Sequence, residues 1–125
     1  MIATTIEQSR KLAEILPAES ADMWYWEFPT APKYNRYDHP MFHKGEGITN
    51  VPAWSLSALL ELIPSHIDKV DTFLRLRMDK DEENFNIWYE DYGTGLCIED
   101  SDIIKNTPID ALFEMIVWLK ENKYI

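Results

Sequence analysis

Two stretches of alternating apolar and polar residues, joined by a short polar segment, constrain the fold of this chain most. Residues 72–78 read TFLRLRM and residues 85–91 read FNIWYED. Alternation with a period of two places the apolar side chains on one face of a strand and the polar ones on the other. We therefore expect a β-hairpin closed by residues 79–84.

The apolar pattern also sets an expected register, because slipping one strand by one residue would turn its apolar side chains to the wrong face. The expected pairs are Met78 with Phe85, Leu76 with Ile87 and Leu74 with Tyr89 on the apolar face, and Phe73 with Glu90, Arg75 with Trp88 and Arg77 with Asn86 on the other. Arg75 over the Trp88 ring would then form a cation–π pair.

Three helices are expected around this hairpin. The first follows Thr4 or Thr5, either of which can cap it, with Glu7 closing a capping box, and it ends before Pro17. The second covers residues 54–63, whose apolar stripe comprises Leu56, Leu59, Leu60 and Ile63. The third covers residues 109–121, with Thr107 as its N-cap, Pro108 at its first position and Asp110 in its first turn.

Two further strands complete the expected architecture. Residues 22–28 (DMWYWEF) read as a strand with Trp24, Trp26 and Phe28 on one face, and residues 96–98 follow a turn as a short strand. A length of 125 residues and 46% hydrophobic content suit one domain with one core. We expect an α+β fold in which three helices pack on one face of a small antiparallel sheet of three or four strands, with residues 1–125 forming a single domain.

The negative charge of the chain is concentrated in one region. Residues 79–102 contain nine acids and one base, a net charge of −8 out of −10 for the whole chain. Such a region opposes binding to nucleic-acid phosphates and suits a basic protein partner, while the alternative is a solvated surface that keeps the protein soluble. The candidate partner surface consists of Asp79, Asp81, Glu82, Glu83, Glu90 and Asp91.

Residues 29–53 form the one long irregular segment, with four prolines and two glycines. A long loop in a compact domain is typical of a functional or mobile segment. Its aromatic residues, with those of the strand before it, could line a ligand pocket or simply fill the core. The candidate pocket residues are Trp24, Trp26, Tyr37, His39, His43 and Trp54.

Partial motifs for metals and cofactors are incomplete. Residues 79–90 place acids at the first, third, fifth and twelfth positions of a calcium-binding loop, but Asn84 replaces the required glycine and the flanks read as strands. Asp38, His39, His43 and Glu46 are possible metal ligands, but Pro40 and the nearby glycines oppose the helix that would put both histidines on one face. We expect no metal, no cofactor and no catalytic residue.

No signal peptide or membrane span is evident, since the longest apolar run is residues 115–119. Cys97 is the single cysteine, so no disulfide can form within the chain. These features favour a cytoplasmic protein without membrane contact. The oligomeric state is left open, a homodimer included.

Three segments of the chain resemble a known group of proteins. The blocks PAWSLSALLELIP (residues 52–64), TPIDALFEMIVWLKENKYI (residues 107–125) and EQSRKLAEILPAESADM (residues 7–23) are similar to small uncharacterised proteins of gut anaerobic bacteria and their phages or mobile elements. The resemblance implies a mobile-element context and assigns no activity or functional residue.

Two functions therefore compete. The favoured one is a non-enzymatic binding or interaction protein whose acidic surface meets a basic partner. The alternative is a small enzyme or ligand-binding domain with its site in the aromatic-rich segment of residues 29–53. A pocket that holds His39 or His43 beside a carboxylate would favour the second, and a flat acidic surface would favour the first.

Overall fold

The computed structural model describes residues 2–69, 72–98 and 101–125. In these residues the chain is α+β, with three α-helices and two antiparallel sheets of two and four strands. It divides into two compact units, Met1–Leu59 and Leu60–Ile125, which are described separately. The expectation of a single domain stays a prediction.

The first unit contains helix α1 (Ile6–Ile15), strand β1 (Met23–Glu27) and strand β2 (Thr49–Ala53), with the 3₁₀ turns η1 (Ala18–Ser20) and η2 (Pro32–Tyr34). Thr5 caps α1, and Gln8 closes the capping box, so the box residue is Gln8 and not Glu7. The helix ends before Pro17, as the sequence predicts.

Strand β1 confirms the strand expected at residues 22–28, and its two faces differ in burial. Met23 and Tyr25 are buried with Val51, Ala53 and Ala3 in one apolar cluster, with Ile6 packed against it. Trp24 and Trp26, on the opposite face, are only half-buried. The core therefore takes Met23 and Tyr25, and the two tryptophans lie on the side where the loop runs.

Strand β2 corrects the expectation that residues 29–53 are irregular throughout. It pairs antiparallel with β1, with Met23 opposite Ala53 and Trp24 opposite Pro52. The backbone N–H and C=O of Trp24 are bonded to Met41 instead, so they point away from β2. Pro52, which has no N–H, therefore occupies a position where no hydrogen bond is required of it.

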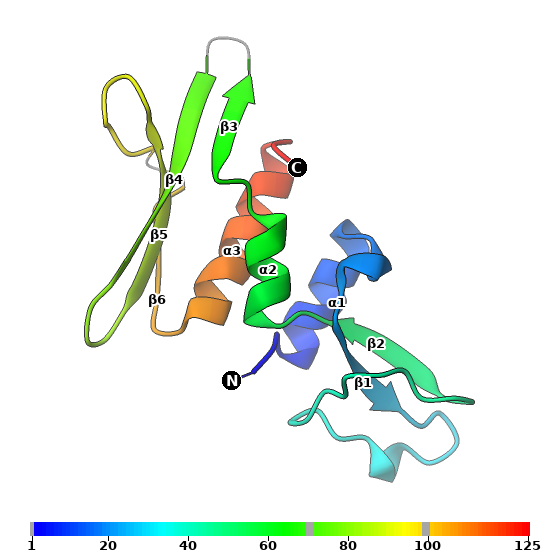
Figure 1. Cartoon of the computed structure of the whole chain (residues 1–125). Helices are drawn as coiled ribbons and strands as arrows, with labels where there is room; N and C mark the ends of the chain where they lie inside the picture. The colour runs from blue at the N-terminus through cyan, green and yellow to red at the C-terminus, as the bar shows by residue number, and fades with distance from the viewer. Residues whose placement is uncertain (1, 70–71, 99–100) are drawn as a thin grey trace. The chain divides into compact units, whose positions relative to one another are not determined.

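The second unit contains strands β3 (His66–Lys69), β4 (Thr72–Lys80), β5 (Phe85–Asp91) and β6 (Ile103–Lys105), and helix α3 (Pro108–Glu121). The four strands form one antiparallel sheet in the order β3-β4-β5-β6. Helix α3 packs against β5 and β6 (Figure 1). The Tyr89 ring stacks on Trp118 with ring centroids 6.0 Å apart. Thr107, Pro108 and Asp110 begin this helix as predicted, and its buried residues are Ile109, Ala111, Leu112, Met115, Ile116 and Leu119.

The hairpin is confirmed, but its expected register is wrong by two residues. Met78 faces Ile87, Leu76 faces Tyr89 and Lys80 faces Phe85. The loop is shorter than expected because Asp81 Oδ1 accepts the backbone N–H groups of Glu83 and Asn84, at 2.9 and 2.7 Å, and closes the chain in four residues. A slip of two keeps every side chain on its expected face.

The strand expected at residues 96–98 is also wrong. Cys97 makes only an isolated bridge to Glu90, and β6 takes the place beside β5 instead. Helix α2 (Leu56–Leu62) is shorter than the expected 54–63, because Ser55 caps it by accepting the N–H of Ala58 at 3.2 Å. Leu59 and Ile63 of its expected stripe are buried, whereas Leu56 and Leu60 are exposed. The boundary between the two units falls within α2.

Candidate ligand pocket

A pocket of about 350 Å³ lies in the first unit, on the tryptophan side of β1. A volume near 300 Å³ is the lower end of the range for sites that take small molecules. The lining combines aromatic rings with polar side chains and consists of Trp26, Phe28, Tyr34, Arg36, Asp38, His39 and Met41.

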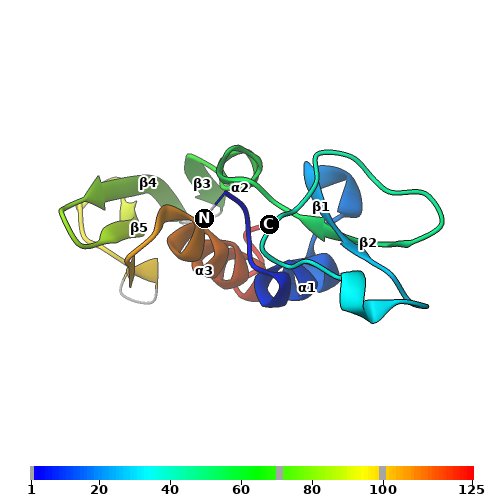
Figure 2. The same cartoon turned by 90° about the horizontal axis from the view of Figure 1, so that it is seen from below.

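The chain forms this pocket by returning alongside β1. After β1 the segment passes through η2 and then bridges back to the strand, where Trp24 and Met41 exchange two backbone hydrogen bonds of 2.8 and 2.7 Å. Figure 2 shows this segment, from cyan into green, running beside β1 and β2. Turn η2 brings the Tyr34 ring edge-on to Phe28, with the centroids 6.3 Å apart. Pro32 at the start of η2 favours this turn because its φ angle is fixed.

A polar cluster fastens the start of this segment to the rest of the unit. Glu27 Oε2 accepts the Tyr37 hydroxyl at 2.6 Å and Arg10 Nη2 at 2.6 Å. Asn35 donates to the Tyr37 hydroxyl at 3.1 Å and accepts the backbone N–H of Phe28 at 2.7 Å. One carboxylate thereby links α1, β1 and the loop, and we call Arg10, Glu27, Asn35 and Tyr37 the latch.

The hydrogen bonds of the latch change the ionisation of its members. The hydroxyl of Tyr37, followed by the guanidinium of Arg10, stabilises the Glu27 carboxylate and lowers the pKa of Glu27. The same hydrogen bond raises the pKa of Tyr37, because a phenolate could no longer donate to the Glu27 carboxylate. The latch therefore holds an ionised carboxylate against a neutral phenol at neutral pH.

Arg36 is the arginine of the pocket lining, and it is exposed. Its Nη1 donates to the backbone carbonyl oxygens of Lys33 and Asn35, at 3.1 and 3.0 Å. These two bonds orient the guanidinium and leave its other N–H groups for a ligand. Among the residues that the structure describes, no carboxylate forms an ion pair with it.

His39 and Asp38 add a polar pair to the lining. His39 Nε2 lies 3.5 Å from Asp38 Oδ2, and both side chains are largely exposed. A histidine beside a carboxylate in a pocket is the arrangement that we expected to favour a ligand site.

The other predicted pocket residues have different positions. Tyr37 belongs to the latch, and its ring meets Tyr25 edge-on at 6.2 Å. His43 packs edge-on against Trp26 at 5.2 Å, and its carbonyl oxygen accepts the Trp26 Nε1–H at 2.9 Å. Trp24 lies under the Lys44 ammonium at 5.8 Å. Of the six predicted residues, Trp26 and His39 line the pocket.

Trp54 is a core residue instead of a pocket residue. It is fully buried, and its Nε1 donates to Ser20 Oγ at 2.9 Å. Its backbone N–H bonds to Thr4 Oγ1 at 3.1 Å, and its carbonyl oxygen accepts the Thr4 N–H at 3.0 Å. Every polar group of Trp54 therefore has a partner inside the unit.

Five residues line the pocket although they are not among the six candidate pocket residues: Phe28, Tyr34, Arg36, Asp38 and Met41. The available signal was the mixture of aromatic and charged residues from Lys33 to Asp38.

The candidate partner surface divides into two parts in the second unit. Asp79, Asp81, Glu82 and Glu83 are exposed at the β4–β5 turn, and we call them the acidic turn. The backbone N–H groups of Asn84 and Glu83 that Asp81 accepts lower the pKa of this carboxyl. The turn is thus a closed structural element that presents carboxylates to solvent.

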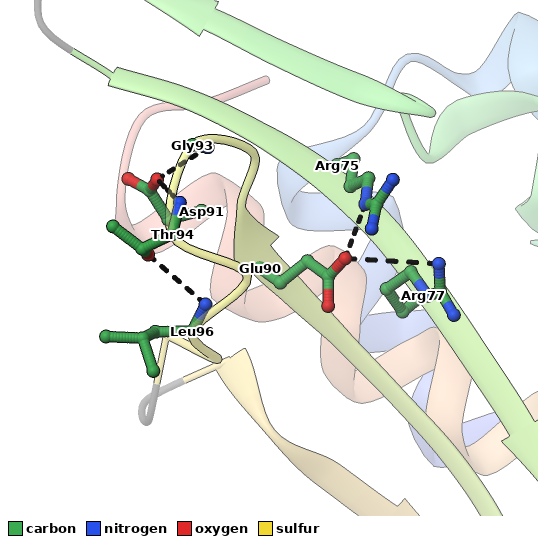
Figure 3. Close-up of polar contacts among 7 residues, drawn as sticks. All are labelled: Arg75, Arg77, Glu90, Asp91, Gly93, Thr94 and Leu96. Atoms are coloured by element: carbon green, nitrogen blue, oxygen red, sulfur yellow. Dashed lines mark hydrogen bonds and ion pairs between the residues drawn. The ribbon is translucent and has the colours of Figure 1, made fainter.

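Glu90 and Asp91 do not join the acidic turn. Glu90 is 9% exposed and forms ion pairs with Arg75 and, at 3.9 Å, with Arg77 (Figure 3). The Arg75 guanidinium also lies over the Tyr92 ring at 5.3 Å, so the expected pair with Trp88 does not form. Asp91 Oδ1 accepts the N–H groups of Gly93 and Thr94, at 2.9 and 3.0 Å, and closes a turn (Figure 3).

The described residues contain no group of three or more His, Cys, Asp or Glu side chains suited to a metal ion. His39, His43 and Glu46 therefore belong to no such group. In the described part of the chain, no helix has the length and apolar character needed to cross a membrane.

Comparison with known proteins identifies no relative: no family model, no curated protein and no solved structure matches the chain. The resemblance to proteins of gut bacteria and mobile elements stays a prediction.

Proposed function

We propose that this protein binds a small, flat ligand in the pocket beside β1. The observation that carries the proposal is the lining of the 350 Å³ pocket, in which Trp26, Phe28 and Tyr34 surround the space together with Arg36, Asp38 and His39. Aromatic and apolar walls supply the affinity of most ligand pockets, and a few polar groups fix the orientation.

The latch supports this proposal. The Glu27 carboxylate, bonded to both Tyr37 and Arg10, holds the start of the pocket segment against α1 and β1. Holding the wall in place before the ligand arrives lowers the ordering cost of binding.

The test uses two tyrosines with equal exposure. Tyr34 lines the pocket and Tyr92 belongs to the second unit, and each is 56% exposed. We would titrate the protein with 2-naphthol, 2-naphthylacetamide and 2-naphthylacetate and follow the indole N–H of Trp26 by NMR. Tyr34→Ala should weaken binding by about tenfold, in line with 1–1.5 kcal/mol for an aromatic contact. Tyr92→Ala should leave binding unchanged. Equal effects of the two substitutions would contradict the proposal.

A second candidate function is recognition of a basic protein by the acidic turn. Its support is the exposure of Asp79, Asp81, Glu82 and Glu83 with only Lys80 among them. Such a local negative field speeds encounter with a positive surface and is screened by salt. The test is the association rate with a lysine-rich peptide at low and high salt, because a salt-independent rate would exclude this turn as the recognition surface.

Three further expectations belong to the proposal. The helices are proposed to gather on one face of the four-stranded sheet, of which α3 against β5 and β6 is one part. A cytoplasmic location is proposed because a single cysteine cannot form a disulfide within the chain. An origin in a phage or mobile element is proposed on the three resembling segments alone.

A further inference from the structure

The four arginines of this chain are not equivalent. Arg10 pairs with Glu27, and both Arg75 and Arg77 pair with Glu90. Arg36 has two backbone carbonyl oxygens as its partners and no ion pair among the described residues. In a chain with 22 acids and 12 bases, an oriented guanidinium without a carboxylate partner is unexpected.

The charge around the pocket also differs from that of the whole chain. Residues 28–48 contain three basic residues (Lys33, Arg36 and Lys44) and two acidic ones (Asp38 and Glu46), a net charge of +1 against −10 for the chain. A segment of net positive charge on an acidic protein favours the approach of an anion at this place.

We propose that the ligand of this pocket is a flat apolar acid. Its carboxylate or phosphate binds the guanidinium of Arg36, and its ring system lies among Trp26, Phe28 and Tyr34. A guanidinium presents parallel N–H donors that match the two oxygens of a carboxylate or phosphate. This inference rests on the proposed function, because it names the ligand class of the same pocket.

Asp38 also lines the pocket and opposes an anion. His39 Nε2 lies 3.5 Å from the Asp38 carboxylate. The anion is therefore assigned to Arg36, whose guanidinium is oriented by the carbonyl oxygens of Lys33 and Asn35.

The experiment compares an acid with its neutral amide. Calorimetric titrations of the full chain would use 2-naphthylacetate, 2-naphthylacetamide and 2-naphthyl phosphate, which share one ring system. We expect at least one of the two anions to bind about tenfold more tightly than the amide, as a charge-assisted hydrogen bond predicts. The stronger of the two anions identifies the natural group as a carboxylate or a phosphate.

Two variants with the same change of charge locate the effect. Arg36→Gln should reduce the preference for the anion over the amide to about one, whereas Arg77→Gln, in the second unit, should keep the wild-type preference. The NMR spectrum of each variant, compared with the wild type, shows whether its fold is retained.

The outcomes separate this inference from the proposed function. Equal binding of acid and amide to the wild type would overturn the assignment of an anion and leave the pocket as a binding site. A preference that persists in Arg36→Gln would overturn the role of Arg36. Absence of binding by all three probes would contradict the proposed function, and with it this inference.

Discussion

Two regions of the molecule, one in each unit, use arginine side chains in opposite ways. In the second unit, Arg75 and Arg77 pair with Glu90, and Arg75 also covers the Tyr92 ring. In the first unit, the guanidinium of Arg36 donates to the backbone carbonyl oxygens of Lys33 and Asn35 and lies beside aromatic rings that border an open pocket. Charges that satisfy one another inside a unit stabilise it, whereas charges that are oriented and left unpaired are available to a ligand. The following predictions test this contrast.

The largest effect is expected in the interior of the second unit. Tyr89 is fully buried, stacks on Trp118 and donates its hydroxyl to the Pro64 carbonyl oxygen at 2.6 Å. Tyr89→Ala should lower the free energy of unfolding by about 3–5 kcal/mol, the range for truncating a buried aromatic residue. Denaturant unfolding measures this loss, with the exposed Tyr92→Ala as its control. Equal losses for the two would show that Tyr89 is not a core residue.

A smaller loss is expected when the ion pairs of Glu90 are broken. Glu90→Gln leaves Arg75 and Arg77 without their carboxylate in a partly buried position. We expect a cost of about 1–2 kcal/mol in the free energy of unfolding. Asp79→Asn at the exposed acidic turn is the matched control and should change stability by less than about 0.5 kcal/mol. If Glu90→Gln were as neutral as this control, the two arginines would not depend on their carboxylate.

The latch should contribute less to the free energy of unfolding than the ion pairs of Glu90, and its contribution should depend on pH. Tyr37→Phe removes one hydrogen bond to Glu27, at a cost of about 0.5–1 kcal/mol near pH 7. Folding lowers the pKa of Glu27 below its ordinary value. The stability that this carboxylate contributes is therefore present above its pKa in the unfolded chain, and it is lost as the pH falls through its pKa in the folded protein.

The difference between Tyr37→Phe and the wild type should therefore shrink as the solution is acidified below about pH 4. Unfolding curves at pH 7 and pH 3 measure it, with Tyr34→Phe in the same segment as a control. A difference that is the same at both pH values would contradict the assigned role of the Glu27 carboxylate.

The smallest effect on folding is expected at the acidic turn. Reversing Glu82 and Glu83 to Lys removes no contact of the closed turn, because Asp81 holds it through backbone N–H groups. The free energy of unfolding should change by less than about 0.5 kcal/mol. Asp81→Ala, which opens the turn, should cost about 1 kcal/mol. A larger loss from the charge reversal than from Asp81→Ala would show that the surface charges stabilise the fold.

Local sequence signals predicted the parts of the fold that depend on local interactions. Helix α3 was predicted with its cap because Thr107, Pro108 and Asp110 act within one turn. The faces of β4 and β5 were predicted because alternation specifies them, but their register was not, since a slip by two residues preserves both faces. Strands β2, β3 and β6 were missed because they are only three to five residues long and depend on pairing with distant residues.

The sequence predicted the segment that holds the candidate site but not most of the residues that line it. The segment after β1 was expected to hold a pocket, and Trp26 and His39 line it. Trp54 was assigned to it because an aromatic residue in a sequence does not show whether its ring faces the core or a pocket. Arg36 was overlooked because a sequence does not show which arginines form ion pairs. In the structure Arg10, Arg75 and Arg77 form ion pairs, and Arg36 forms none among the described residues.

The contrast between the two units can be measured directly at the arginine side chains. The Nε–H signals of Arg36 and Arg75 can be followed by NMR at about pH 6 while 2-naphthylacetate is added to the wild-type protein. The Arg75 Nε–H is bonded to Glu90, whereas the Arg36 guanidinium retains N–H groups beyond those of Nη1, which donates to the carbonyl oxygens of Lys33 and Asn35. We expect the Arg36 signal to shift in a saturable manner and the Arg75 signal to stay in place. A shift of both signals together, or of neither, would contradict the assignment of Arg36 as the ligand-binding arginine.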